Sequence, residues 1–111
     1  MGSRDLNKAE WRGFFDRVSK ALGSGNAAEV EVMSLNLGDQ IEAEWVPLLG
    51  LSYDPKGDAF DVMLKGLDHR IEKPSAIYLE EGPVGLASIE IIDAEGTRQI
   101  VKLRNPVRLP G

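Results

Sequence analysis

The chain contains 111 residues, of which 42% are hydrophobic and 28% charged, and its formal net charge is -5. These values exclude a disordered chain and a second core, so we expect a single acidic domain over residues 1–111. The acid excess opposes nucleic-acid binding, no apolar run approaches the roughly 20 residues that span a bilayer, and without cysteine no disulfide or thiolate metal site can form.

A single amphipathic helix is predicted over about residues 8–22. Asn7 can cap its first turn, and Glu10, three residues later, can close a capping box. Gly23 is expected to end the helix in the left-handed conformation. Apolar side chains recur at helical spacing, which predicts a face buried in the core rather than a ligand site. These side chains are Trp11, Phe14, Phe15, Val18 and Leu22.

Antiparallel strands are expected within about residues 28–104. A turn at residues 37–39 reverses the chain between the first two strands, and two prolines predict an extended, unpaired tail over residues 105–111. Besides a central hairpin over residues 48–64, the predicted strands cover residues 28–36, 40–46, 76–81, 86–93 and 97–104, with a short strand at 69–72.

The strand over residues 40–46 is predicted to be half-buried. Ile41, Ala43 and Trp45 alternate there with Glu42 and Glu44, which indicates one apolar and one acidic face. Pro47 is then expected to interrupt the ladder at a corner, because a central strand does not accommodate proline.

The central hairpin turns at residues 54–57, Asp-Pro-Lys-Gly, a type I pattern in which Gly57 takes the left-handed conformation. If Asp54 lies opposite Asp58, Leu51 pairs with Asp61 and Gly50 with Val62. Both faces of this ribbon then carry apolar side chains, so both faces need cover. Residues 93–96, Asp-Ala-Glu-Gly, repeat the turn pattern and predict three opposed pairs: Ile91 with Gln99, Ile89 with Val101, and Ala87 with Leu103.

These elements predict an α+β fold in which the N-terminal helix packs on a mostly antiparallel sheet of six or seven strands. Six strands are about 29 Å wide, whereas a helix about 10 Å across covers only about two of them. We therefore expect a sheet curled into a small barrel or half-barrel with the helix on its open side, or one paired face to face with a second copy.

Several segments resemble a family of small bacterial proteins of unknown function. They are residues 6–11 (LNKAEW), 14–17 (FFDR), 42–48 (EAEWVPL), 50–56 (GLSYDPK), 66–69 (GLDH), 77–78 (IY), 88–90 (SIE) and 93–100 (DAEGTRQI). The resemblance covers nearly the whole chain. It implies a compact bacterial domain and transfers no activity or functional residue.

Three residues are candidates for a ligand pocket near the Pro47 corner: His69, Tyr53 and Glu44. They are chosen because corners of small barrels leave concavities. Catalysis by His69 with Ser88, or by the paired carboxylates Glu42 and Glu44, lacks the sequence context of known sites. A loop histidine and a solvated acidic strand face explain these residues as well.

The basic side chains Arg98, Lys102 and Arg104 share a strand face and are candidates for anion binding, although Glu90 and its neighbours can neutralise them across the strand pair. Asp54, Asp58 and Asp61 do not match a calcium loop, and turn formation explains the first two. Asp61 is expected either at the edge of its face or paired with Lys or Arg. No metal or cofactor is predicted.

The leading functional hypothesis is a small, non-enzymatic, cytoplasmic binding domain that associates with itself as a homodimer or with a protein partner. The alternative is a small-ligand binder or hydrolase-like enzyme that uses a pocket near Pro47. A third hypothesis, anion or nucleic-acid binding through the basic face, is opposed by the net charge, so neither nucleic-acid nor membrane partners are expected.

Overall fold

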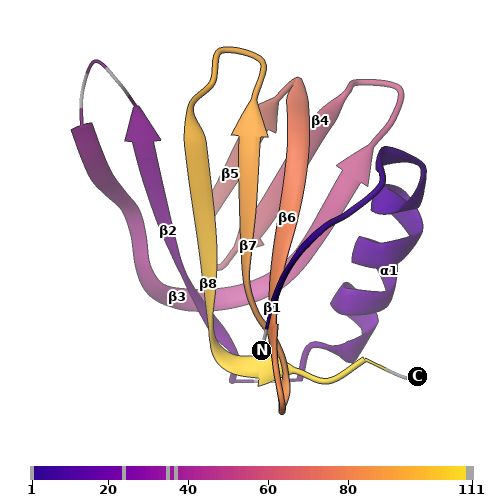
Figure 1. Ribbon diagram of the computed structural model, residues 1–111. Helices are drawn as coiled ribbons and strands as arrows, with labels where there is room; N and C mark the ends of the chain where they lie inside the picture. Colours follow the sequence, from indigo (N-terminus) through magenta and orange to yellow (C-terminus); the bar gives the residue numbers. More distant parts are fainter. Residues whose placement is uncertain (1, 24, 35, 37, 110–111) are drawn as a thin grey trace.

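The computed structural model describes residues 2–23, 25–34, 36 and 38–109, and it has an α+β fold (Figure 1). Within these residues a 3-10 turn, η1 (Lys8–Glu10), leads into one α-helix, α1 (Trp11–Ala21). The strands are β1 (Gly2–Asp5), β2 (Ala27–Ser34), β3 (Gly38–Asp54), β4 (Ala59–Leu64), β5 (Leu67–Glu72), β6 (Pro74–Gly82), β7 (Gly85–Asp93) and β8 (Arg98–Val107).

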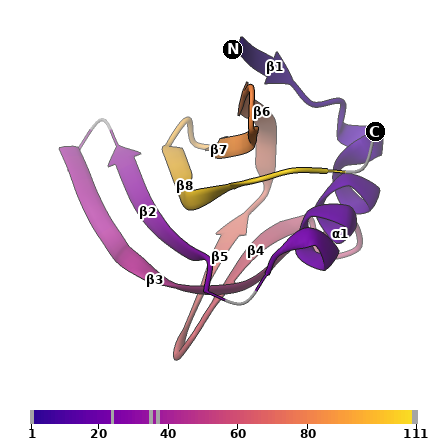
Figure 2. The same ribbon diagram turned by 90° about the horizontal axis from the view of Figure 1, so that it is seen from below.

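The eight strands form one antiparallel sheet in the order β1-β6-β7-β8-β2-β3-β4-β5, so the prediction of six or seven strands is wrong. The sheet curves strongly, and α1 lies at the open side of the curve (Figure 2). A closed barrel does not form, because β5 does not pair with the other edge strand, β1. Instead β5 meets β8, where His69 Nε2 lies 2.5 Å from Gln99 Oε1.

The helix begins close to the predicted position. The side chain of Asn7 accepts a hydrogen bond from the N–H of Ala9 at 3.0 Å, which confirms the cap. Glu10 makes no side-chain cap bond, so the predicted capping box is wrong. The first turn is 3-10, and the backbone N–H of Glu10 donates to the carbonyl of Asn7 at 2.9 Å.

The apolar face of α1 is buried as predicted, through Trp11, Phe14, Phe15 and Val18. The helix ends at Ala21. Leu22 leaves with an extended backbone while its N–H still donates to Val18. A left-handed Gly23 is therefore not needed, and the φ angle of Gly23 is not positive.

Strand β3 is 17 residues long and changes partner along its length. Residues 38–47 pair with β2, whereas residues 48–54 pair with β4 on the opposite side. The corner predicted at Pro47 is confirmed, because the ladder with β2 ends at this residue and the ladder with β4 begins at the next one, although β3 itself continues through it. The carbonyl of Pro47 accepts the N–H of Lys65 at 3.0 Å. The strand bends here (Figure 1), and Trp45 has a φ of 51°.

The side of residues 48–54 that β4 leaves unpaired is covered by α1. Ser19 Oγ donates to the carbonyl of Leu51 at 2.6 Å and accepts from the N–H of Leu51 at 2.9 Å. One helix side chain thus satisfies both backbone groups of a strand residue, as a neighbouring strand would.

The hairpin between β3 and β4 differs by one residue from the predicted register. Asp54 lies opposite Ala59, and Leu51 lies opposite Val62. A shift of one residue moves side chains to the other face of a strand, so the predicted two-sided apolar ribbon is wrong. The large buried side chains of residues 51–64 share one face: Leu51, Tyr53, Phe60, Val62 and Leu64.

The hairpin between β7 and β8 has the predicted register near its turn. Ile91 lies opposite Gln99, and Ile89 lies opposite Val101. Gly96 takes the left-handed conformation with a φ of 85°. The predicted Ala87–Leu103 pair does not form, because the ladder is irregular there and resumes with Leu86 opposite Val107.

Both ends of the chain pair more than expected. Residues 2–5 form the unpredicted strand β1 beside β6. Strand β8 continues to Val107. The prediction of an unpaired tail from residue 105 is therefore wrong for residues 105–107. Asn26 holds this segment, since its side chain donates to the carbonyl of Asn105 at 3.1 Å. Leu35, Leu37 and residues 110–111, which belong to predicted elements, lie outside the described residues.

One core cluster joins α1 to strands β2 through β8. Its largest fully buried side chains are Trp11, Phe15, Phe60, Leu51, Leu64, Ile71, Ile77, Leu79, Leu86, Ile89, Ile91 and Val18. In the described part of the chain, no helix has the length and apolar character required to cross a membrane.

Candidate functional site

An arm of the sheet, formed by residues 27–34 of β2 and 38–46 of β3, carries a largely exposed strand segment, residues 38–46. In the two ribbon views it lies on the side of the molecule away from α1 (Figures 1 and 2). Residues 38–46 pair with β2 on one side only, because β4 begins to pair at Leu48. We call the unpaired side of residues 38–46 the open edge.

Two large apolar side chains lie exposed along the open edge. Ile41 is 48% exposed and Trp45 is 37% exposed. The predicted burial of both is therefore wrong, and of the three alternating residues Ile41, Ala43 and Trp45 only Ala43 is buried. The register between β2 and β3 is irregular around Val30, which pairs with Ala43 while its neighbour Glu31 pairs with Ile41. Such a bulge breaks the alternation of faces.

The two tryptophans differ in accessibility and in hydrogen bonding. Trp11 is buried, and its indole N–H donates to the carbonyl of Leu6 at 2.8 Å. The indole N–H of Trp45 has no hydrogen-bond partner among the residues that the structure describes. A left-handed backbone is unusual for a bulky residue and costs about 1–3 kcal/mol. The chain thus holds Trp45 outward at an energetic cost.

Acidic side chains surround these apolar ones. Asp39, Glu42 and Glu44 are exposed, and none of them forms an ion pair within the described residues. Exposed edges are often protected against pairing by charges and bulges. Here both the charges and the bulge occur on a strand that also has an exposed tryptophan.

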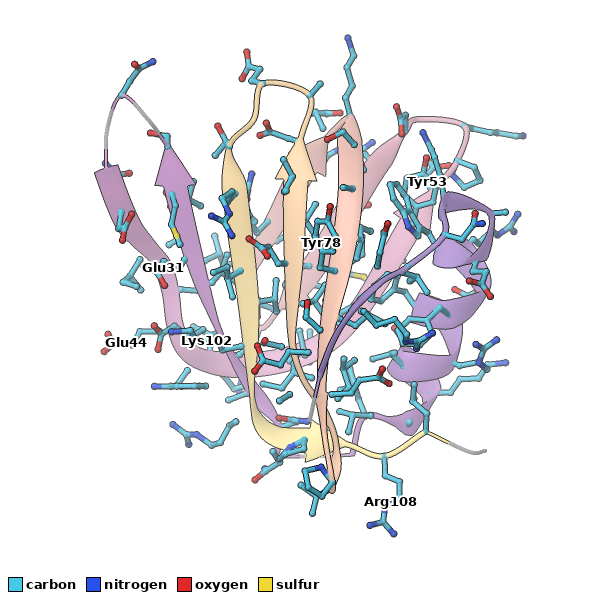
Figure 3. All side chains as sticks on the ribbon, viewed as in Figure 1. Glu31, Glu44, Tyr53, Tyr78, Lys102 and Arg108 are labelled. Carbon is cyan, nitrogen blue, oxygen red and sulfur yellow. The ribbon has the colours of Figure 1, made fainter. Side chains whose placement is uncertain are left out.

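The three predicted ligand-binding residues lie in separate places. Glu44 is on the arm, and Tyr53 lies near the start of α1 on the opposite side of the view (Figure 3). His69 is on β5 and contacts Gln99 of β8. Tyr53 lines a shallow hollow with Lys8, Arg12 and Asp58, and neither His69 nor Glu44 lines it. The positions of the three residues do not support a shared pocket. That pocket stays a prediction.

Tyr53 is the residue whose protonation the fold changes most clearly. Its hydroxyl donates to Asp58 Oδ1 at 2.7 Å, and its ring meets Trp11 edge-on with 5.0 Å between centroids. Burial, followed by the hydrogen bond and charge of Asp58, raises the pKa of Tyr53 from 10.0 to about 12.

This pKa shift predicts a loss of stability in alkali. The folded state holds the phenolic proton more tightly than the unfolded chain, so the stabilisation is complete below a pH of about 10 and is lost as the pH rises toward about 12. In a Tyr78→Phe background, the ultraviolet absorbance of tyrosinate reports Tyr53 alone. Replacing Asp58 by Asn should lower the pKa of Tyr53. An unchanged pH midpoint of the tyrosinate absorbance would show that Asp58 does not raise this pKa.

The three predicted anion-binding residues already have neighbours. Arg98 pairs with Glu90 at 2.5 Å, and Lys102 lies 3.7 Å from Glu31. Arg104 places its guanidinium 5.3 Å from the ring centroid of Trp45. In Figure 3 the labelled Lys102 and Glu31 both lie on the side of the molecule away from α1. The anion site stays a prediction, and the two ion pairs reduce the charge available for it.

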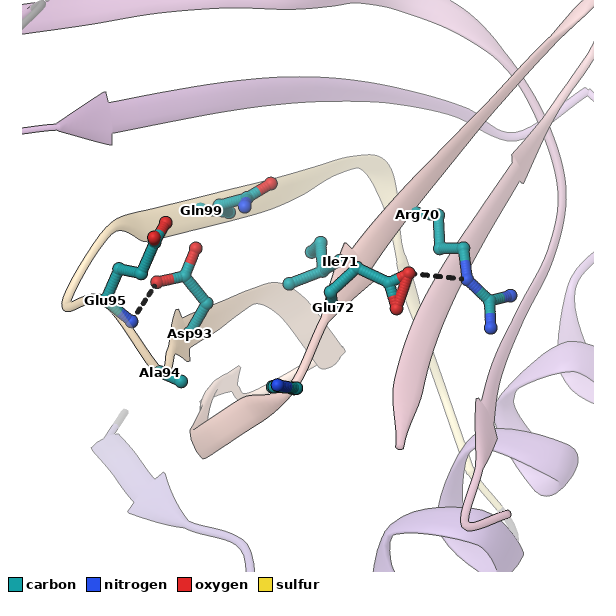
Figure 4. Close-up of a pocket in the computed structure, with 8 residues that line it drawn as sticks. Arg70, Ile71, Glu72, Asp93, Ala94, Glu95 and Gln99 are labelled. Atoms are coloured by element: carbon teal, nitrogen blue, oxygen red, sulfur yellow. Dashed lines mark hydrogen bonds and ion pairs between the residues drawn. The ribbon is translucent and has the colours of Figure 1, made fainter. Parts of the chain in front are cut away.

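A hollow of about 490 Å³ opens between β5 and the β7–β8 turn (Figure 4). Its lining carries charges of both signs, and Arg70 there is paired with Glu72 at 3.2 Å. Asp93 accepts the backbone N–H of Glu95 at 2.9 Å, which is part of the turn. Most of the charged side chains that line this hollow are therefore engaged in ion pairs or in hydrogen bonds of the turn.

The aspartates near the β3–β4 turn have structural roles. Arg70 Nη1 lies 3.2 Å from Asp61, which is the second of the two alternatives predicted for Asp61, pairing with a basic residue. Asp54 accepts the N–H of Lys56 at 3.0 Å. Among the described residues, no group of three or more His, Asp or Glu side chains is arranged to hold a metal ion.

Comparison with known proteins gives a family but no activity. The sequence pattern of a family described as "Family of unknown function (DUF5335)" matches residues 2–111. A protein of Aquifex aeolicus (strain VF5), described as uncharacterized, is 40% identical over 111 residues, which is 99% of each chain. No solved structure matches the chain.

Proposed function

The chain belongs to the DUF5335 family, whose description assigns no activity, and we propose that it is a small, non-enzymatic binding domain that takes up an extended polypeptide segment along the open edge. In this mode the bound segment adds a strand to the sheet. Backbone hydrogen bonds provide affinity, and side chains on alternate residues provide specificity.

The observation that supports this proposal is the combination of an unpaired strand with an outward-held Trp45. An unpaired strand presents backbone N–H and C=O groups that another chain can satisfy. Tryptophan is enriched among the residues that contribute most to binding interfaces. The strained backbone at Trp45 lies where β3 bends, and its side chain is 37% exposed at that bend.

A small-ligand site near Pro47 has less support. The residues predicted for it are distributed over the arm, the start of α1 and the β5–β8 contact. General acid–base catalysis requires such groups within hydrogen-bond reach of one substrate. The open edge, in contrast, is formed by consecutive residues of one strand.

The test is a nuclear magnetic resonance titration of the labelled protein with three strand-forming decapeptides, in which valine alternates with lysine, glutamine or glutamate. We expect at least one peptide to shift the amide signals of residues 38–46. Trp45→Ala should weaken that binding about tenfold or more, as truncation of an aromatic anchor commonly does. Leu49→Ala is the matched control, because Leu49 is 64% exposed on the same strand but lies outside the open edge.

Three peptides that leave these signals unchanged at millimolar concentration, together with a monomeric protein, would refute the proposed function. Equal effects of Trp45→Ala and Leu49→Ala would remove Trp45 from the site. Amide spectra of both variants establish that each is folded.

A further inference from the structure

The charge of the arm points to the class of partner. Residues 27–34 and 38–46 include five acidic residues and neither lysine nor arginine. The acidic residues are Glu29, Glu31, Asp39, Glu42 and Glu44. Within the described part of the chain, only Glu31 of these forms an ion pair, with Lys102.

We infer that the segment bound at the open edge is a basic strand of another protein, in which lysine or arginine alternates with apolar residues. This inference rests on the proposed function and specifies its partner. Opposite charges on directly opposed strand residues stabilise a pair, and like charges destabilise it. Basic side chains in the segment would lie across from the exposed carboxylates Glu42 and Glu44.

The exposed apolar positions of the edge favour a segment that carries apolar residues as well as basic ones. Ile41 and Trp45 are exposed on either side of the buried Ala43. A strand whose side chains are all charged would leave these two surfaces uncovered. The ring of Trp45 already contacts the guanidinium of Arg104, so its electron-rich face suits a second cationic side chain.

The same charges oppose a second copy of this chain as the occupant. Two open edges paired antiparallel about Ala43 would set Glu42 of one copy opposite Glu44 of the other. Pairing about Glu42 would oppose that residue to itself. Each copy contributes three unpaired carboxylates to such a ladder, and no basic residue of the arm neutralises them.

The probes are the decapeptides that alternate valine with lysine, glutamine or glutamate. We expect the lysine peptide to bind about tenfold more tightly than the glutamate peptide. This preference should shrink as sodium chloride rises from about 0.05 to about 0.5 M, because salt screens exposed charges. N-methylation of alternate residues on one edge of the lysine peptide should abolish binding, whereas methylation of the other edge should not.

Charge reversal locates the interaction. The double variant Glu42→Lys with Glu44→Lys should prefer the glutamate peptide. The control double variant, Asp16→Lys with Glu95→Lys, makes the same change in net charge at exposed positions outside the arm and should keep the preference for lysine.

The outcomes separate this inference from the proposed function. Equal binding of the three peptides, or the same response from both double variants, would overturn the inference that the bound segment is basic. The proposed addition of a strand at the open edge would not be affected. A dimer that forms through residues 38–46 without peptide would also overturn it. If no peptide shifts those residues and no dimer forms, the proposed function itself fails.

Discussion

Replacing Phe60 by alanine is expected to lower the free energy of unfolding by about 3–5 kcal/mol, the range for removing a phenyl ring from a core. Phe60 on β4 is fully buried, and its ring meets Phe15 of α1 edge-on with 4.8 Å between centroids. The cavity would lie between the helix and the strand pair that it covers, where neither rigid element can move in to fill it. Urea denaturation followed by circular dichroism measures the loss.

Val84→Ala is the control for this experiment. Val84 is 57% exposed in the turn between β6 and β7, so its truncation should change stability by less than about 0.5 kcal/mol. A loss below about 1 kcal/mol for Phe60→Ala would mean that the contact between α1 and β4 contributes little to the fold.

Replacing Ser19 by alanine is expected to destabilise the protein by about 2–6 kcal/mol, because it leaves two buried backbone groups of Leu51 without a partner at about 1–3 kcal/mol each. Leu51 is fully buried, so water does not readily replace the hydroxyl. Urea denaturation gives the total effect. Hydrogen exchange at the amide of Leu51 should accelerate in the variant and identifies where the loss occurs.

Two variants test whether the hydroxyl itself is responsible. Ser52→Ala removes a half-buried hydroxyl from the residue next to Leu51, and in the described structure that hydroxyl has no hydrogen bond, so stability should change little. Ser19→Thr keeps the hydroxyl and should retain most of the stability. Unchanged protection of Leu51 in Ser19→Ala would show that the helix does not protect this strand through Ser19.

The two hairpins show how far turn chemistry predicts register. Both turns place aspartate first and glycine fourth, but the left-handed residue is Gly96 in one and Asp58 in the other. Asp58 is held there by the hydroxyl of Tyr53 and by the N–H of Lys73, which donates to its carbonyl at 2.8 Å. Lys73 lies 15 residues further along the chain and reaches Asp58 only once β5 has paired with β4, so the sequence of the turn alone does not reveal this partner.

The faces of β3 could not be read from alternation for a similar reason. The bulge near Val30 and the left-handed Trp45 each shift the pattern of faces. Alternation correctly indicated that Ala43 is buried, and it failed for Ile41 and Trp45 on either side. The amphipathic helix was predictable, since its buried face depends only on spacing within one element.

The open edge could not be predicted, because it is a property of topology rather than of local sequence. It exists because β2 and β4 pair with different halves and different sides of β3. The sequence does contain one hint. The acidic pattern at Asp39, Glu42 and Glu44 is typical of a strand that faces solvent.

The position of β1 constrains the order in which the protein can assemble during synthesis. Arg4 on this strand pairs with Glu81, 77 residues further along the chain. Strand β1 precedes β6 in the chain, so its ladder cannot form until β6 has been translated. The β1–β6 ladder therefore contributes contacts of high sequence separation, the kind associated with slower folding.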